Sequence, residues 1–215
     1  MNMKLSRRSA LRKIAGSTAA VAVAANLSQR LSAANAAAPQ LKGHVNHSVC
    51  KWCYDKIPLE EFCQAGKEMG LQSVELLEVK DFPTLKKYGL TCAVVSGVPG
   101  GIGSGLNRVE NHDKIVEFME RTLPAAAEFG APNVICFSGN RNGLDDEKGL
   151  ENCALGLKRI APLAEKHKVT VIMELLNSKV NHKDYQCDYS KWGVELCKRV
   201  GSERFKLLYD IYHMQ

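Results

Sequence analysis

The sequence has no excess of charge once its first 38 residues are set aside. Residues 1–38 hold six of the 29 Lys and Arg residues and no Asp or Glu, which leaves 23 basic residues against 23 acidic residues in the rest of the chain. Proteins that bind nucleic acid normally carry a basic surface that neutralises phosphates. The formal net charge of +6 therefore indicates no such surface, and we expect no nucleic-acid partner.

Two nucleotide-binding patterns are missing as well. The Gly-rich segment SGVPGGIGSGLNR (residues 96–108) lacks the Gly-Lys-Ser/Thr ending of a P-loop, and no dinucleotide fingerprint follows the first predicted strand. We expect this segment to be a flexible loop over the mouth of a site. Arg108 and His112, at its end and just beyond it, either contact an anionic substrate or face solvent.

The leader has no run of about 20 strongly apolar residues, the length that a membrane-spanning helix needs. Its apolar stretch, residues 14–27, is short and rich in Ala, Gly and Ser. A basic start precedes this stretch and the small-residue segment LSAANAAAPQ follows it, which is typical of a secretory signal. We predict that residues 1–38 form a signal peptide, cleaved near residues 36–38, that leaves no stable membrane anchor. An uncleaved anchor is the alternative.

The paired Arg7 and Arg8 resemble a twin-arginine export signal. The Phe that usually follows the pair is missing because Ala10 stands there, and Leu11 partly compensates. No Cys lies in the leader, which argues against a lipid anchor. The resemblance implies export of the folded protein and a periplasmic or secreted location.

The sequence contains eight Cys residues, all beyond the leader. Cys50 and Cys53, in CKWC, have the spacing of a redox pair. We expect the first strand to run through this motif and the next helix to begin only at Pro58, which does not fit a thioredoxin-like site, and zinc would need a second ligand pair. Five others lie in apolar strand-like or helical patterns, where Cys is usually a small buried hydrophobic residue: Cys63, Cys92, Cys136, Cys153 and Cys197.

The composition, 45% hydrophobic and 24% charged, is that of one globular domain, and we assign residues 39–215 to it. Apolar runs without polar alternation indicate parallel strands that are buried on both faces. Amphipathic helical patterns separate these runs, so the class is α/β. The expected strands are residues 44–53, 71–79, 90–97, 132–139, 169–177 and 205–210. The expected helices are residues 58–70, 82–89, 111–130 with an interruption at Pro124, 145–168 and 188–201.

Six such βα units form either an open doubly wound sheet or most of a (β/α)8 TIM barrel. A polar residue accompanies every predicted strand: His47, Glu75, Ser96, Ser138, Glu174 and Asp210. A barrel gathers its strand ends into one ring, whereas an open sheet spreads them along a line. This distribution therefore favours the barrel.

Three residues are candidates for chemistry. Glu174 lies at the end of the apolar run VTVIMELLN, where an isolated carboxylate must be paired, hydrogen-bonded or bound to a metal. Asp210 and His213, in YDIYHMQ, follow the next strand. The alternative is that Asp210 only caps a helix and that His213 is an ordinary loop residue. Two carboxylates and one imidazole at one mouth form a ligand set for Mn²⁺, Mg²⁺ or Zn²⁺.

The segments VTVIMELLN and LLYDIYHMQ, together with the VELL strand, resemble the hydroxypyruvate isomerase-like branch of the xylose isomerase-like TIM barrels. The resemblance covers essentially the whole chain after the leader. It implies that Glu174 and Asp210 are two of four metal ligands, that Glu174 also moves the substrate proton, and that His213 contacts a substrate oxygen. It also implies that the sequence stops about two βα units early, with strand edges exposed to self-association into a homo-oligomer.

The resemblance implies an isomerase or epimerase that moves a proton between adjacent carbons of a small sugar or hydroxy-carbonyl substrate. A carboxylate base and a metal that stabilises an enediolate are what this chemistry requires. Two alternatives remain open. One is a catalytically inactive barrel that binds a small molecule or a partner, and the other is a phosphodiester-cleaving endonuclease of the same fold.

Overall fold

The structure is a computed structural model that describes residues 45–215, so the predicted signal peptide, residues 1–38, lies outside the described residues. The described part of the chain contains six strands: β1 (Ser48–Cys50), β2 (Ser73–Glu75), β3 (Val94–Val95), β4 (Asn133–Cys136), β5 (Thr170–Leu175) and β6 (Phe205–Tyr209). The α-helices are α2 (Leu59–Glu68), α3 (Phe82–Lys87), α4 (His112–Phe129), α5 (Asp146–His167), α6 (Ser190–Val200) and α7 (Ile211–Met214). Short 3-10 helices are η1 (Lys51–Tyr54), η2 (Val79–Asp81) and η3 (Val109–Asn111). Within residues 45–215, no helix has the length and apolarity that crossing a membrane would require.

The strands are all parallel and follow one another in chain order. β1 pairs with β2, and β3, β4, β5 and β6 form a continuous sheet. Parallel bridges from Ser73 to Thr91 and from Leu77 to Val95 join the two groups. A doubly wound sheet would instead reverse its strand order at a switch point. The consecutive order confirms the barrel prediction, with six of the eight βα units of a complete barrel.

The first two strands are shorter than the sequence predicts. β1 ends at Cys50, and η1 begins at once, so the CKWC motif opens a 3-10 helix instead of continuing a strand. β2 ends at Glu75 because Leu76 adopts a left-handed backbone with φ 60°, which turns the chain out of the ladder. Cys50 and Glu75 are thus the last residues of their strands, and both lie at the carboxyl edge of the sheet.

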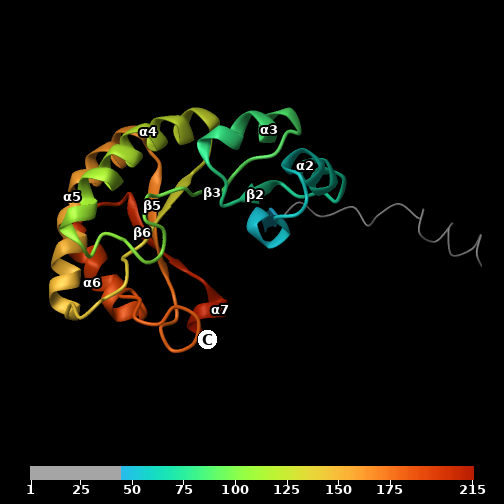
Figure 1. Cartoon of the computed structure of the whole chain (residues 1–215). Coiled ribbons are helices and arrows are strands. Elements are labelled where there is room, and N and C mark those ends of the chain that lie inside the picture. Colours follow the sequence, from blue (N-terminus) through green and yellow to red (C-terminus); the bar gives the residue numbers. More distant parts are fainter. Residues whose placement is uncertain (1–44) are drawn as a thin grey trace, which may run out of the picture. The chain divides into compact units, whose positions relative to one another are not determined.

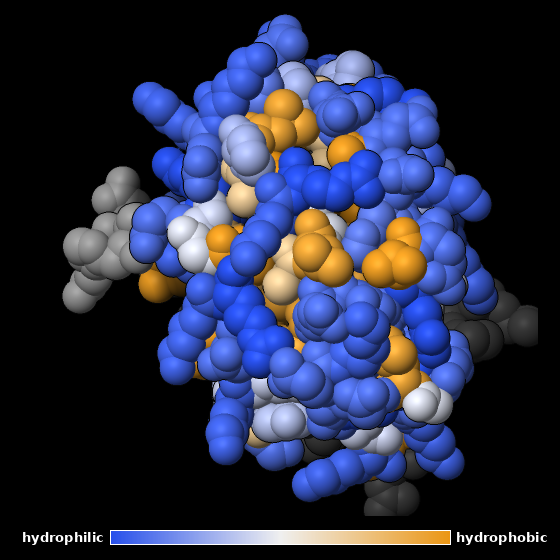
Figure 2. Space-filling model, turned by 90° about the vertical axis from the view of Figure 1, so that its left-hand side faces the viewer, coloured by the Kyte–Doolittle hydropathy of each residue, from blue (hydrophilic) through white to orange (hydrophobic). Residues whose placement is uncertain are grey.

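The long helices α4, α5 and α6 cover the outer side of the strands (Figure 1). α4 and α6 end at Gly130 and Gly201, each in a left-handed conformation that glycine adopts without steric cost. The predicted interruption at Pro124 is wrong, because Pro124 lies inside a continuous α4. The helix-covered face is mainly hydrophilic, with apolar side chains in separate small groups (Figure 2).

The apolar core lies between the strands and these helices, and it includes most of the cysteines. Cys63, Cys92, Cys136 and Cys153 are buried as predicted, whereas Cys197 is only partly buried. All eight cysteines are free thiols in the structure. Burial raises the pKa of Cys92 to about 11, which keeps such a thiol protonated and unreactive.

The Gly-rich segment is anchored, which contradicts the expectation of a flexible loop. The backbone N–H groups of Leu106 and Asn107 donate to the carbonyls of Phe137 and Ser138, and the N–H of Asn140 donates to the carbonyl of Gly103. The segment therefore lies as an added backbone layer against the end of β4.

Arg108 and His112 both have structural partners. The Arg108 guanidinium donates to the carbonyls of Arg141 and Asn142. His112 is buried, with its Nε2 at 2.9 Å from the carbonyl oxygen of Leu106. Each side chain fastens the Gly-rich segment to its surroundings, so neither of the predicted roles, an anion contact or simple solvent exposure, describes them.

Candidate metal centre

The structure brings Glu174, Asp210 and His213 together at the carboxyl ends of β5 and β6. Glu174 is the fifth residue of β5 and pairs in register with Leu208 of β6. Asp210 directly follows β6, and His213 lies one turn later in α7. One ligand atom from each of the three residues lies within 4.8 Å of the others. The strand pairing therefore converts two distant sequence segments into one cluster.

Glu174 is partly buried and carries a perturbed carboxyl group. Burial and, to a lesser extent, the nearby Asp210 carboxylate together raise its pKa to about 7. Among the described residues, no Lys or Arg forms an ion pair with Glu174. The alternative of a salt bridge to a neighbouring strand is therefore not what the structure contains.

Asp210 has two roles in the structure. One carboxylate oxygen caps α7 by accepting a hydrogen bond of 2.7 Å from the backbone N–H of Tyr212. The other oxygen, Oδ2, lies 3.9 Å from Nε2 of His213. The predicted helix cap and the predicted ligand position are thus compatible, because they use different oxygens.

The residues fit a divalent cation by their chemistry. Two carboxylates at this separation repel each other, and partial burial increases that repulsion. A cation between them would remove both penalties, and oxygen ligands with one imidazole suit Mn²⁺, Mg²⁺ or Zn²⁺. Glu174 and Asp210 are the groups that would hold it.

Three residues outside the predicted set also contact the cluster: Asn177, His182 and Tyr185. The Asn177 side chain lies 2.9 Å from Nδ1 of His213, and the ring of His182 packs edge-on against the ring of His213 with centroids 5.1 Å apart. The Tyr185 hydroxyl donates to the backbone carbonyl of Glu174 at 3.1 Å. Asn177 ends the quoted VTVIMELLN run, so its position after the strand was the available signal.

Cys50 and Glu75 lie at the same edge of the sheet, where they are register partners in β1 and β2. Burial raises the pKa of the Cys50 thiol, and the charges of Cys53, Glu75, Glu174 and Asp210 raise it further. The ends of β1, β2, β5 and β6 thus converge on one mouth. Glu75 itself is buried and accepts a hydrogen bond from the backbone N–H of Val94 at 2.8 Å, which is a structural role.

Three other polar residues of the predicted ring do not join the cluster. His47 is exposed and precedes β1, at the amino end of the strand. The Ser96 hydroxyl donates to the carbonyl of Leu76 at 2.9 Å. Ser138 is buried, and its hydroxyl accepts a hydrogen bond from the backbone N–H of Cys187. The two serine side chains hold strand ends and loops in place.

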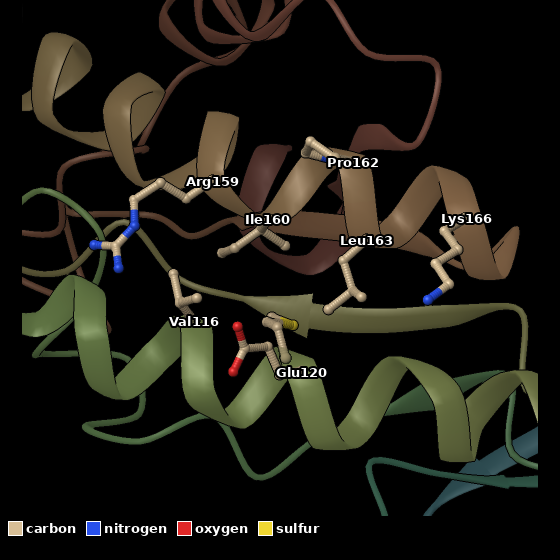
Figure 3. A pocket seen from close by; sticks show the side chains of 8 residues that line it. Val116, Glu120, Arg159, Ile160, Pro162, Leu163 and Lys166 are labelled. Carbon is tan, nitrogen blue, oxygen red and sulfur yellow. The ribbon is translucent and has the colours of Figure 1, made fainter.

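A separate groove of about 260 Å³ lies between α4 and α5, on the helical side of the domain (Figure 3). Val116 and Glu120 line it from α4, and Arg159, Leu163 and Lys166 line it from α5. None of its lining residues belongs to the cluster at the strand ends. The groove is therefore distinct from the candidate metal centre.

Residues 63–215 match the family described as the xylose isomerase-like TIM barrel. The chain belongs to this family. No protein of curated function matches the sequence. The match includes Glu174, Asp210 and His213, so the cluster lies inside the family's own domain.

Solved structures of this fold are similar at low sequence identity. A family 2 AP endonuclease from Brucella melitensis is 22% identical with a TM-score of 0.68, covering 80% of this chain and 70% of its own. A D-psicose 3-epimerase from Clostridium cellulolyticum H10 is 14% identical with a TM-score of 0.63, covering 79% and 64%. A 3-keto-D-glucoside 4-epimerase from E. coli is 17% identical with a TM-score of 0.58, covering 72% and 64%. The chain thus spans less than two thirds of these epimerases.

Proposed function

We propose that this protein is a metal-dependent isomerase or epimerase of a short sugar or a hydroxypyruvate-like α-hydroxy carbonyl compound. The observation that carries the proposal is the convergence of Glu174 and Asp210 with His213 at the strand ends of a xylose isomerase-like barrel. The epimerases with a similar fold support the reaction class. The hydroxypyruvate isomerase-like branch and the substrate remain part of the proposal.

Glu174 is suited to act as the base. Removal of a proton from a carbon beside a carbonyl needs a positioned carboxylate base, and Glu174 lies at the strand end with a pKa that is raised to about 7 in the metal-free protein. The protonated carboxyl can then return the proton to the adjacent carbon. This shuttle makes an enediolate from the substrate and collapses it to the isomer.

Asp210, by holding a cation, and His213, by direct contact, would both act on the substrate oxygens. Glu174 and Asp210 would hold a divalent cation, which would supply positive charge to the developing oxyanion. Asp210 holds its position through the hydrogen bond to α7, so the carboxylate is fixed before substrate arrives. His213 lies beside Asp210 and reaches the same space with its Nε2 atom.

The test is to measure isomerisation of short hydroxy-carbonyl compounds by the purified protein with Mn²⁺, Mg²⁺ or Zn²⁺ and with a chelator. The Glu174→Gln variant should lose activity by about 100-fold or more, as expected for removal of an acid/base group. Glu128→Gln is the matched control, because Glu128 is exposed on α4 and distant in sequence from the cluster. Metal binding without turnover of any such compound would favour an inactive, small-molecule-binding barrel.

An endonuclease function is the weaker alternative. The chain after residue 38 balances 23 basic and 23 acidic residues, whereas binding of the phosphate backbone normally relies on excess positive charge. Cleavage of an abasic-site oligonucleotide that Glu174→Gln abolishes would decide for the endonuclease and against the isomerase.

A further inference from the structure

Asn177 has a side chain whose orientation is fixed by four hydrogen bonds. Its Oδ1 atom accepts from the backbone N–H groups of Val180 at 3.1 Å and Asn181 at 3.0 Å. Its Nδ2 atom donates to Oδ1 of Asn181 at 3.0 Å and faces Nδ1 of His213 at 2.9 Å. An exchange of the amide oxygen and nitrogen would leave two backbone donors pointing at an NH₂ group, which has no lone pair to offer. The two backbone bonds therefore identify the atom that faces His213 as a donor.

That assignment determines which nitrogen of His213 carries the proton. A neutral imidazole has one N–H and one bare nitrogen, and a hydrogen bond to one nitrogen sets the state of the other. Because Asn177 donates to Nδ1, Nδ1 must be the bare nitrogen and Nε2 must carry the hydrogen.

The Nε2 atom of His213 lies on the side of the ring that approaches Asp210. Its distance to Oδ2 of Asp210 is 3.9 Å, which is too long for a hydrogen bond, and the His213 side chain is only 10% exposed. Among residues 45–215, no acceptor lies within hydrogen-bond distance of Nε2. The Nε2–H group of this largely buried side chain thus lies near the Asp210 carboxylate without a hydrogen-bond partner among these residues.

We infer that Asn177 is a positioning residue that holds His213 in its Nε2–H tautomer, so that His213 offers the site a hydrogen-bond donor and not a metal ligand. By distance alone, His213 could join Glu174 and Asp210 around an ion. A nitrogen that carries hydrogen has no lone pair in the ring plane, however, and cannot coordinate a metal. The cation would then rest on the two carboxylates, and the Nε2–H would bind an oxygen atom of the ligand.

The use of this donor on a substrate oxygen rests on the proposed function, whereas the tautomer itself does not. We therefore test the tautomer without metal or substrate, by ¹⁵N NMR of the full chain labelled in its histidines, at pH 8 where an ordinary His is neutral. The His213 signals are identified among the six histidines by their absence from a His213→Gln spectrum. Long-range ¹⁵N–¹H correlations should show a bare Nδ1 and a protonated Nε2.

The Asn177→Asp variant should reverse the tautomer. A carboxylate can still accept from the backbone of Val180 and Asn181, but it presents an acceptor to Nδ1, which must then carry the hydrogen. Asn181→Asp is the matched control, because Asn181 already acts as an acceptor toward Asn177 and the change adds the same charge to the same turn. His213 should keep its original tautomer in this control.

A wild-type His213 with a protonated Nδ1 would overturn the inference, whatever the variants show. A folded Asn177→Asp variant in which His213 keeps a bare Nδ1 and a protonated Nε2 would overturn it as well. A protein that shows the expected tautomer and yet isomerises no hydroxy-carbonyl compound would refute the proposed function while leaving the inference intact.

Discussion

The carboxylate oxygens of Glu174 and Asp210 lie within 4.8 Å of each other at the ends of two neighbouring strands. At this distance two negative charges oppose ionisation of one another, and burial of Glu174 adds to the effect. The two carboxylates therefore destabilise each other in the metal-free protein. Binding of a proton or of a cation removes this repulsion, and the two compete for the same site.

We predict that divalent metal binding weakens as the pH falls through 7. The Glu174 carboxyl has a pKa of about 7, so below that pH a metal must displace a proton, and the apparent affinity should fall about tenfold from pH 8 to pH 6. Calorimetric titration with Mn²⁺ at both pH values measures this. The Glu174→Gln variant should bind more weakly and with little dependence on pH. Equal wild-type affinities at pH 6 and pH 8 would contradict the prediction.

We also predict that Glu174→Gln stabilises the metal-free protein above pH 7. A carboxyl whose pKa is raised by folding lowers the free energy of unfolding once it ionises, so the wild type should lose stability as the pH rises from about 4.5 to about 7. The Gln side chain avoids this cost, and the variant should gain about 1–3 kcal/mol at pH 8 and little at pH 4.5. Urea denaturation in the presence of a chelator is the measurement. A variant that is less stable than the wild type at pH 8 would be evidence against the charge argument.

The fold and the central cluster follow from the sequence because both depend on periodicity and on strand ends. The apolar runs of the sequence located every strand. Parallel pairing of β5 and β6 then brings Glu174 and Asp210 to the same edge of the sheet. The hydrophobic pattern did not predict that β1 would end at Cys50 or that β2 would end at Glu75. Those endings depend on single backbone conformations, such as φ 60° at Leu76, which no pattern of hydrophobicity encodes.

The contacts that hold His213 and the Gly-rich segment in place could not be predicted from the sequence either. The role of Asn177 depends on a turn that returns two backbone N–H groups to its side chain. The anchoring of the Gly-rich segment depends on contacts with residues more than 30 positions away, such as those of Asn107 and Arg108. The glycine content suggested a flexible segment, whereas long-range hydrogen bonds hold this segment against the sheet.

Cys50 and Cys53 should be dispensable for metal binding and for isomerisation. The motif does open a helical turn, which the sequence did not suggest, but burial and nearby carboxylates raise the pKa of the Cys50 thiol, and a reactive redox thiol needs the opposite. The double change to Ser should cost at most about 1–3 kcal/mol of stability. Thermal unfolding and metal titration check this result. Loss of catalytic activity in a folded, metal-binding variant would instead assign the pair to the site.

Export should depend on the arginine pair of the leader. The residues concerned, Arg7 and Arg8, lie outside the described part of the chain, and the prediction rests on their resemblance to a twin-arginine signal. Changing both to Lys keeps the charge and should trap the precursor in the cytoplasm. Fractionation followed by immunoblotting measures the distribution, with the Lys4→Arg and Lys13→Arg double variant as a charge-matched control. Normal export of the Arg-to-Lys variant would remove the twin-arginine assignment.

Two glycines of the Gly-rich segment should respond very differently to alanine. A Cβ at Gly105 would lie 2.3 Å from the carbonyl oxygen of Phe137 and 2.4 Å from the backbone N of Gly139, so the backbone pairing that anchors the segment must shift. Gly101, four residues earlier, has nothing within 4 Å of such an atom, and only its φ of 55° opposes the change. Gly105→Ala should therefore destabilise the protein by about 2–4 kcal/mol, and Gly101→Ala by about 1 kcal/mol.

Urea denaturation of the two alanine variants, each compared with the wild type, tests whether the segment is a fixed layer or a free lid. A lid that moves independently of the sheet would tolerate both changes equally, because neither glycine would then be held against the end of β4. Similar midpoints for the two variants would therefore restore the flexible-loop interpretation. A large loss confined to Gly105→Ala would mean that the segment stays fixed against β4. Any opening of the site would then come from another segment at the same mouth, such as the turn between Asn177 and Tyr185, which carries His182 beside His213.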